Sequence, residues 1–377
     1  MKTKPSSTEP SVAIIGTVGV PAAYGGFETL ADELLQYAQQ KGVACQFSVY
    51  CSGQKPVGIT DYCGAQRRFI PISANGIPSI FYDIFSCLHA WWRGDKKLLI
   101  LGVSGAPVLP LLRLFSRVKI VTNVDGVEWK REKWNRIAGL YLRIAEWLAV
   151  TFSHDVIADN EGIKDYLKET YGRNSSVITY GGDHALRGTA VSLPVSVPES
   201  YAMSLCRIEP ENNVSIILES FVDSTGLPLV FVGNWDASPY GRELWQAYSD
   251  CDNITLLKPI YDENILYTLR HKACLYIHGH SAGGTNPSLV EMMHFGIPVI
   301  AFDCIYNRHT TIDKALYFSS HQQLRDLVEN VLREDDKSDG QYTARLGAEM
   351  ATVAETTYVW SEIGKRYLDL LEIDATG

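Results

Sequence analysis

The sequence lacks the segments that mark secreted and membrane-spanning proteins. Its N-terminus, MKTKPSSTEP, has no apolar core, so we expect no secretion signal. The most apolar stretch, Leu98–Leu112, is too short to span a bilayer and is interrupted by glycine and proline. None of the eight cysteines stands in Cys-x-x-Cys spacing, and several lie in strand-like runs. This pattern predicts free, buried thiols in a reducing compartment.

Several catalytic and metal-binding motifs are also missing. The sequence contains no G-x-S-x-G, no P-loop and no G-x-G-x-x-G in its first glycine-rich loop. Acyl transfer by a nucleophile elbow, P-loop phosphoryl transfer and the dinucleotide fingerprint therefore lack support. The pair His278 and His280 has no further ligand cluster, and Asp250-Cys-Asp252 falls at the end of an expected helix, so we expect no metal.

The composition is that of a globular protein with an uneven charge. Of the 377 residues 46% are hydrophobic and 20% charged, which provides substantial cores and, by length, two or three domains. The net charge of −9 argues against a dedicated nucleic-acid binder. Residues 1–185 carry 20 basic and 17 acidic side chains (+3), whereas residues 186–377 carry 14 and 26 (−12). The two halves therefore have different electrostatic surroundings.

Short strand-like runs alternate with helical ones along most of the chain. The expected strands are 12–16, 47–51, 98–103, 118–123, 155–158 and 177–180, followed by 201–206, 229–232, 254–257, 275–278 and 299–302. This alternation predicts an α/β protein with two Rossmann-like domains whose parallel sheets face a central cleft. The expected parts are a flexible leader (1–10), an N-terminal domain (11–185), a linker (186–198), a C-terminal domain (199–340) and C-terminal helices (341–377) that pack back toward the N-terminal domain.

Ligands of such sheets bind beyond the carboxyl ends of the strands, so the loops there are the candidate sites. The loop from Gly16 to Glu28 contains Gly25 and Gly26 at the start of a helix, where the backbone can approach an anion closely. An ordinary strand-to-helix loop is the alternative. We place Glu28 on the side of the acceptor or the membrane.

A second candidate loop begins after the strand 118–123. Asp125-Gly126 there permits a tight turn that would direct a carboxylate into the cleft, although Asp125 is also a good N-cap. A basic and aromatic cluster follows, with Trp129, Lys130, Arg131 and Trp134. Such a cluster can meet an anionic membrane or stack on a sugar, or it can be a solvated helix face.

The C-terminal half contributes two further candidates. Arg207, at the end of a strand, suits a bidentate phosphate contact or a surface ion pair with Glu209 or Glu211. The segment His278–Glu291 combines a glycine-rich turn with an N-cap and a helix start, a combination suited to a nucleotide diphosphate. Its candidate ligands are Gly283, Gly284, Thr285, Asn286 and Glu291. Glu291 would accept hydrogen bonds from a ribose, unless it lies on a solvated face.

Four phrases in order, YGGFE, VDGVEWKREKW, RIEPENN and HSAGGTNPSLVE, resemble the GT-B glycosyltransferases of family 4, and among them the bacterial rhamnosyltransferase branch. The resemblance covers nearly the whole chain. It implies that Gly25 and Gly26 approach the donor diphosphate, that Arg207 binds it and that Glu291 holds the ribose. Asp125-Gly126 stands where many members have His-Gly near the donor sugar, so Asp125 is the main catalytic candidate.

Two positions depart from the family pattern. The lysine expected five positions after Arg207 is Asn212, and the first glutamate of the Glu-x7-Glu pair is replaced by Gly283. One cation for the diphosphate and one carboxylate for the sugar are therefore missing. The departures fit a deoxysugar donor, or else a loss of activity.

The resemblance implies a retaining, metal-independent glycosyltransferase without a cofactor. The expected donor is dTDP-L-rhamnose, and the expected acceptor is a saccharide on a polyprenyl diphosphate, used for lipopolysaccharide or capsule. The alternatives are another hexosyltransferase with a UDP- or GDP-sugar, a sugar-nucleotide epimerase on the same fold, and an inactive nucleotide-sugar sensor. Because the N-terminal half is basic and rich in tryptophan, we expect a cytoplasmic protein that is peripheral on the inner face of the membrane, in contact with anionic lipid through residues 60–140.

Overall fold

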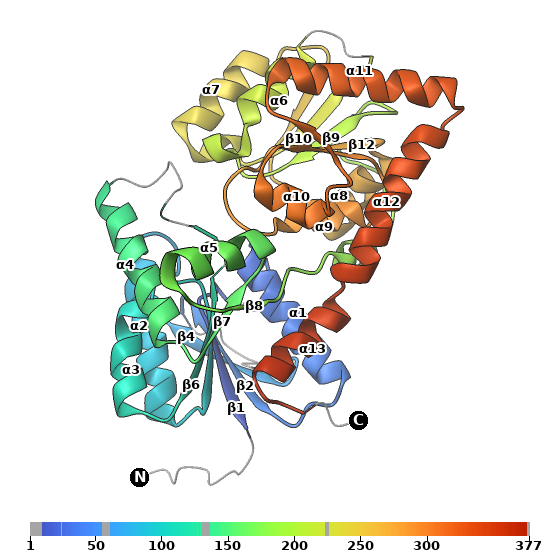
Figure 1. Cartoon of the computed structure of the whole chain (residues 1–377). Helices are drawn as coiled ribbons and strands as arrows, with labels where there is room; N and C mark the ends of the chain where they lie inside the picture. Colours follow the sequence, from blue (N-terminus) through green and yellow to red (C-terminus); the bar gives the residue numbers. More distant parts are fainter. Residues whose placement is uncertain are drawn as a thin grey trace. The chain divides into compact units, whose positions relative to one another are not determined.

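A computed structural model of the chain describes residues 10–23, 25–54, 61–124, 126–127, 129, 136–222 and 226–374. These residues form two compact units (Figure 1). The first unit contains the described residues up to Trp129, residues 136–178 and the chain from Trp360 onward, and the second contains residues 179–359. The second unit therefore begins at Thr179, whereas the sequence predicts a first domain that ends at residue 185.

The first unit is built on an eight-stranded sheet with the order β3-β4-β2-β1-β5-β6-β7-β8. Its strands are β1 (Ser11–Ile15), β2 (Gln46–Ser52), β3 (Asp61–Tyr62), β4 (Ala65–Ile70), β5 (Lys97–Leu101), β6 (Lys119–Val124), β7 (Asp155–Ala158) and β8 (Ser176–Val177). All neighbours are parallel except the pair β3 and β4. The central strands are buried on both faces, as parallel sheets require.

Helices cover both faces of this sheet. Their bounds are α1 (Gly26–Gln40), α2 (Pro78–Arg93), α3 (Leu109–Phe115), α4 (Arg136–Phe152), α5 (Glu161–Tyr171) and α13 (Trp360–Leu370). The helices α2, α3 and α4 lie on one face, whereas α1 and the C-terminal α13 lie on the other (Figure 1). The hydroxyl of Tyr367 accepts a hydrogen bond of 2.6 Å from Asn123 Nδ2, which fastens α13 to the end of β6.

The second unit has a six-stranded parallel sheet with the order β11-β10-β9-β12-β13-β14. The strands are β9 (Ala202–Leu205), β10 (Leu229–Val232), β11 (Ile254–Leu257), β12 (Leu275–His278), β13 (Val299–Phe302) and β14 (Leu316–Phe318). The helices are α6 (Val214–Phe221), α7 (Pro239–Tyr248), α8 (Glu263–Lys272), α9 (Pro287–Met293), α10 (Ile305–Thr311), α11 (His321–Lys337) and α12 (Gln341–Thr357). The helices α6 and α11 share one core against the strands, and α8, α9 and α10 lie on the opposite face (Figure 1).

Two segments outside these sheets differ from the expected domain plan. Part of the expected linker is fastened to α8, because Thr189 N donates to Asn264 Oδ1 (2.9 Å) and Val191 N to Thr268 Oγ1 (2.9 Å). Among the C-terminal helices, α12 belongs to the second unit and α13 to the first. The division follows packing: Gly347 of α12 meets the backbone of Gly296, which precedes β13.

Candidate functional site

The loop between β1 and α1 is held in shape by two carboxylates of α1. Val18 N donates to Glu28 Oε1 (2.7 Å), and Ala22 N donates to Asp32 Oδ2 (2.7 Å). Gly25 is the N-cap of α1 with a φ of 119°, a region that side chains disfavour. A Cβ at Gly25 would also lie 2.0 Å from Glu28 Oε2. The loop therefore depends on glycine at this position, and Gly26 begins the helix as expected.

Glu28 belongs to the interior of this loop. Its side chain is buried, and burial raises the pKa of the carboxyl, while its hydrogen bonds to backbone amides oppose that rise. The bond from Val18 shows that Glu28 holds the shape of the loop. Its place on the side of the acceptor or the membrane stays a prediction.

The expected reaction centre lies only partly within the described residues. Asp125, Lys130, Arg131 and Trp134 fall outside them. β6 ends at Val124, so Asp125 directly follows a strand at its carboxyl end. Trp129 is described: its Nε1 donates to the Tyr166 hydroxyl (3.2 Å), and the Arg143 guanidinium lies 5.2 Å from its ring centroid.

In the second unit, Arg207 follows β9 and is partly exposed. Its Nη2 lies 3.7 Å from Glu209 Oε2. The surface ion pair that the sequence offered as the alternative is therefore present, at a long distance. Exposed pairs of this kind contribute little to stability, so a stronger anion could displace Glu209. Arg207 is therefore suited to bind a diphosphate, and this role stays a prediction.

Asn212, which stands in place of the family's lysine, is buried and fully engaged. Its Nδ2 donates to the Arg207 carbonyl (2.6 Å), and its Oδ1 lies 2.6 Å from His280 Nδ1. The turn after β9 is thereby joined to the loop after β12. Asn212 thus supplies no positive charge but fixes the backbone of Arg207 relative to His280.

Backbone conformation explains the glycines that follow β12. A Cβ at Gly279 would lie 2.1 Å from the Asn212 carbonyl oxygen, so the two loops touch there. Gly283 has a φ of 111°, and the backbone of a glutamate at this position would be strained by that angle. The buried Thr285 follows, and Asn286 caps α9 by accepting from Ser288 N (3.1 Å). The predicted N-cap is confirmed.

Glu291 is largely enclosed within the second unit, with 12% of its side chain exposed, and it is paired with Arg270 and His184. Arg270 Nη2 of α8 bonds to its Oε2, and His184 Nε2 lies 3.4 Å from its Oε1. Burial pushes the pKa of Glu291 upward, but Arg270 and His184 outweigh burial, so the pKa lies below its usual range. The alternative, in which Glu291 lies on a solvated face, does not hold, and ribose binding by Glu291 stays a prediction. Sequence reasoning missed Arg270 and His184, because neither stands near Glu291 in the chain.

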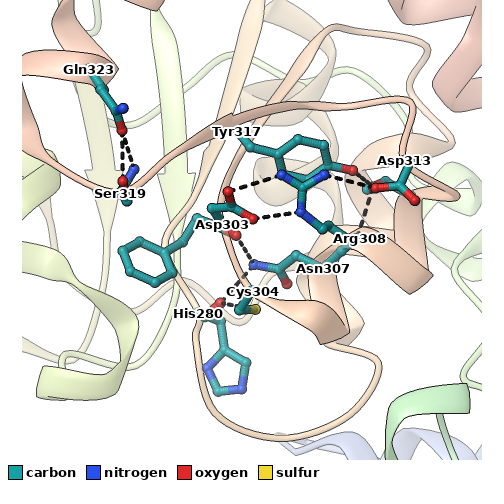
Figure 2. A network of polar contacts seen from close by, with 11 residues as sticks. His280, Asp303, Cys304, Asn307, Arg308, Asp313, Tyr317, Ser319 and Gln323 are labelled. Carbon is teal, nitrogen blue, oxygen red and sulfur yellow. Dashed lines mark hydrogen bonds and ion pairs between the residues drawn. The ribbon is translucent and has the colours of Figure 1, made fainter.

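A polar network, also missed from the sequence, supports the loop after β12 from α10 (Figure 2). Asn307 Nδ2 donates to the carbonyls of His280 (2.8 Å) and Phe302 (2.9 Å). Arg308 binds Asp303 at 2.6 and 2.9 Å and Asp313 at 2.9 Å. The signal available in the sequence was Asp303, which directly follows β13 at the carboxyl end of the sheet, with Asn307 shortly after it in α10.

The structure gives two further findings that concern ligands and membranes. His278 is fully buried, and burial lowers the pKa of its imidazole to about 3, so the ring is neutral at pH 7. Among the described residues, no group of three His, Cys, Asp or Glu side chains is placed to hold a metal ion. No helix in the described part of the chain has the length and hydropathy needed to cross a bilayer.

Comparisons with solved structures define the class of fold. The sucrose-phosphate synthase of Thermosynechococcus elongatus matches with a TM-score of 0.76 at 16% identity, over 97% of this chain and 98% of that one. HepE of Anabaena in complex with UDP-glucose matches with a TM-score of 0.69 at 14% identity, over 96% and 99%. A glycosyltransferase from Rickettsia africae matches with a TM-score of 0.69 at 13% identity, over 97% and 98%. The two Rossmann-like units therefore form a GT-B fold.

Two family models match the two halves of the chain separately. Residues 192–345 match the family Glycosyl transferases group 1, and residues 9–183 match a domain of unknown function, DUF1972. No curated protein matches the sequence. The second unit is therefore similar to the group 1 glycosyltransferases, and the whole chain has the GT-B fold of the solved structures above.

Proposed function

We propose that this protein is a group 1 glycosyltransferase of family 4. It would transfer L-rhamnose, with retention of configuration, from dTDP-L-rhamnose to a saccharide on a polyprenyl diphosphate. The product would serve a bacterial surface polysaccharide. The observation that carries the donor proposal is Gly283, which stands in place of the family's first glutamate and has a φ of 111°, a conformation that disfavours a glutamate at this position. A deoxysugar has one hydroxyl fewer than a hexose, so it can do without that carboxylate, which would otherwise be left without a partner.

The described residues suggest how donor binding would be divided. Arg207 and the backbone amides of residues 283–286 would stabilise the charge that develops on the leaving diphosphate, an electrostatic task that needs positioned donors. Glu291 would accept from the ribose while Arg270 keeps it ionised and oriented. Asn212 would hold the Arg207 backbone, which leaves one cation for the diphosphate on this turn.

The chemical step would need little from the protein beyond positioning. The acceptor hydroxyl would attack the anomeric carbon on the face that the diphosphate leaves, the bond to the diphosphate oxygen would break, and the hydroxyl proton would pass to a diphosphate oxygen. Asp125 would orient the acceptor or stabilise the cationic sugar centre. Asp125→Asn should therefore lower kcat more than donor affinity, and full activity of this variant would remove Asp125 from the reaction.

A donor panel tests the proposal. The purified protein is incubated with dTDP-L-rhamnose, UDP-glucose, UDP-N-acetylglucosamine and GDP-mannose, each with and without a lipid-linked saccharide acceptor. Turnover with dTDP-rhamnose alone supports the proposal, whereas turnover with hexose donors alone contradicts it. Interconversion of the nucleotide sugar without acceptor would indicate an epimerase, and tight binding without turnover would indicate a sensor.

A further inference from the structure

Three helices of the first unit expose an unusual amount of apolar surface. The described part of the chain has nineteen exposed large hydrophobic side chains, and eleven of them lie on or next to α2, α3 and α4. They are Ile77, Phe81, Phe85, Trp92, Leu111, Leu114, Phe115, Ile137, Leu140, Ile144 and Trp147. We call this set the α2–α4 face. Apolar surface gathered in this way marks an interaction site in soluble proteins.

The intervals between the exposed residues show that each helix has a continuous apolar stripe on its solvent side. On α2 and its N-cap the exposed residues Ile77, Phe81 and Phe85 recur every four positions. On α4, Leu140, Ile144 and Trp147 recur at intervals of four and three. These intervals keep side chains on one side of a helix. Both helices bury other residues against the sheet, so each has one apolar side inside and another in solvent.

The three helices lie together on one side of the sheet. α3 packs against α4, and both contact the short turn Ala106–Val108, which also contacts α2 (Figure 1). Polar bonds join the same elements, since the Tyr141 hydroxyl donates to the Ser104 carbonyl (2.6 Å) and Ser104 Oγ bonds to Asp83. Next to α4, Leu140, Ile144 and Trp147 line a surface hollow of about 340 Å³.

Charge distinguishes this face from the rest of the molecule. The two carboxylates on α2, α3 and α4 are Asp83 and Glu146, and both are buried. Glu146 accepts hydrogen bonds of 2.6 Å from the hydroxyls of Tyr166 and Tyr171, which keep it inside. The arginines on or next to these helices, in contrast, are exposed; they are Arg93, Arg113, Arg117, Arg136 and Arg143. The face is therefore apolar and cationic in a protein whose net charge is −9.

We infer that the α2–α4 face docks on an anionic lipid bilayer, with its aromatic and leucine side chains in the interfacial region and its arginines on lipid phosphates. Apolar residues flanked by arginine are the pattern that binds such surfaces. A second copy of the chain fits poorly, because two faces that each carry five exposed arginines and no exposed carboxylate would repel each other. The inference rests on this surface alone, and it does not depend on the identity of the donor sugar.

The α2–α4 face refines the membrane contact expected from the sequence, because nine of its eleven residues lie within the expected region, 60–140, and the other two are Ile144 and Trp147. Not every cation of that region is available for lipid: Lys97 Nζ donates to the carbonyl of Glu372 (2.9 Å) within the first unit. The chemistry is also more apolar than the basic contact that the sequence predicts. Because apolar side chains insert, binding should weaken but persist as salt is raised, rather than disappear.

Vesicle flotation with the full chain tests the inference. The wild type should bind vesicles of phosphatidylglycerol and phosphatidylethanolamine at low salt, and bind phosphatidylcholine vesicles much more weakly. The double variants Phe81→Ser/Phe85→Ser and Leu140→Ser/Ile144→Ser should each lose at least tenfold in partition coefficient. Tyr261→Ser/Val222→Ser, at exposed apolar positions of the second unit, should bind like the wild type.

A second readout reports insertion directly. Brominated lipids should quench the fluorescence of Trp92 and Trp147. The variant Trp92→Phe/Trp147→Phe should lose that quenching and still bind the vesicles. Wild type that ignores anionic vesicles at low salt, or double variants that bind as well as the wild type, would overturn the inference. A dimer that the double variants disperse, without vesicle binding, would make the face a self-association surface. Donor turnover, measured without vesicles, reports separately on the proposed function.

Discussion

At the scale of single residues, Arg207 is the cation on which donor binding should depend. It follows β9 and touches Glu209 only loosely, at 3.7 Å. Arg207→Ala should weaken nucleotide-sugar binding by roughly 1–3 kcal/mol, the range of a charged hydrogen bond. Isothermal titration with the preferred donor measures this, and Arg242→Ala on the exposed surface of α7 is the matched control. Equal affinities of wild type and Arg207→Ala would remove Arg207 from the site.

The contribution of Glu291 to the free energy of unfolding should depend on pH. Its folded-state pKa is lowered, so its contribution is present above the usual carboxyl pKa and is lost as the pH falls through the lowered value. Glu291→Gln leaves Arg270 buried without its partner, which should cost roughly 3–5 kcal/mol of unfolding free energy at pH 7. Denaturant unfolding from pH 7 down to pH ~3 should show this difference shrinking below pH ~4.5.

A control is available on α11, where Glu329 lies on the exposed side. Glu329→Gln should change the unfolding free energy little at any pH. If Glu291→Gln behaves like Glu329→Gln at pH 7, then the ion pair with Arg270 does not stabilise the second unit.

At the scale of elements, α2 carries a buried carboxyl with an unusual proton affinity. Burial raises the pKa of Asp83 to about 7, and the hydrogen bond from Ser104 only partly opposes this. A raised folded-state pKa means that folding retains the proton, so the unfolding free energy falls as pH rises from about 4 to about 7. Asp83→Asn removes this dependence and should stabilise the protein at pH 8 by roughly 3–4 kcal/mol. Denaturant unfolding at several pH values is the measurement.

The amide oxygen that Asp83→Asn introduces can still accept from Ser104, so the packing between α2 and the loop after β5 is kept in this variant. Asp165→Asn, on an exposed position of α5, serves as the control and should leave the pH profile unchanged. A profile of Asp83→Asn that runs parallel to that of the wild type would show that Asp83 is ionised in the folded protein.

Elements differ in how far the sequence predicts them. The buried strands β5, β7 and β10 are short apolar runs, and the expected ranges agree with the structure to within two residues. β4 (Ala65–Ile70) was missed because it carries Arg67 and Arg68 and is only half-buried, so its alternation is weak. The strand β4 forms because its backbone pairs with that of β2. Residues with strong local signals are predictable, whereas a strand that depends on its neighbour is not.

The candidate site divides in the same way. The cap of α9 at Asn286 and the need for glycine at Gly25 are local properties, and both follow from a few adjacent residues. The partners of Glu291 come from distant parts of the chain, and so does the contact of Asn212 with His280. Sequence spacing therefore named the candidate positions but could not predict which distant side chains hold them in place.

At the scale of the whole molecule, the C-terminal segment is shared between the two units. The helix α12 stays with the second unit, and the chain then returns so that α13 completes the first. Each helix has a glycine at its tightest contact. A Cβ at Gly364 would lie 2.6 Å from the Tyr37 ring of α1, and a Cβ at Gly347 would lie 1.9 Å from the Gly296 carbonyl. The two glycines therefore allow each unit to be perturbed separately.

Gly364→Ala should destabilise the first unit and Gly347→Ala the second, each by about 1–3 kcal/mol, the usual cost of overpacking. Hydrogen exchange with mass spectrometry resolves the two. Gly364→Ala should speed exchange in peptides of β1 and α1 and leave β12 and β13 unchanged, although Gly364 lies at the opposite end of the chain from β1. Gly347→Ala should give the reverse pattern. Faster exchange in β12 for Gly364→Ala, with β1 unaffected, would contradict the assignment of α13 to the first unit.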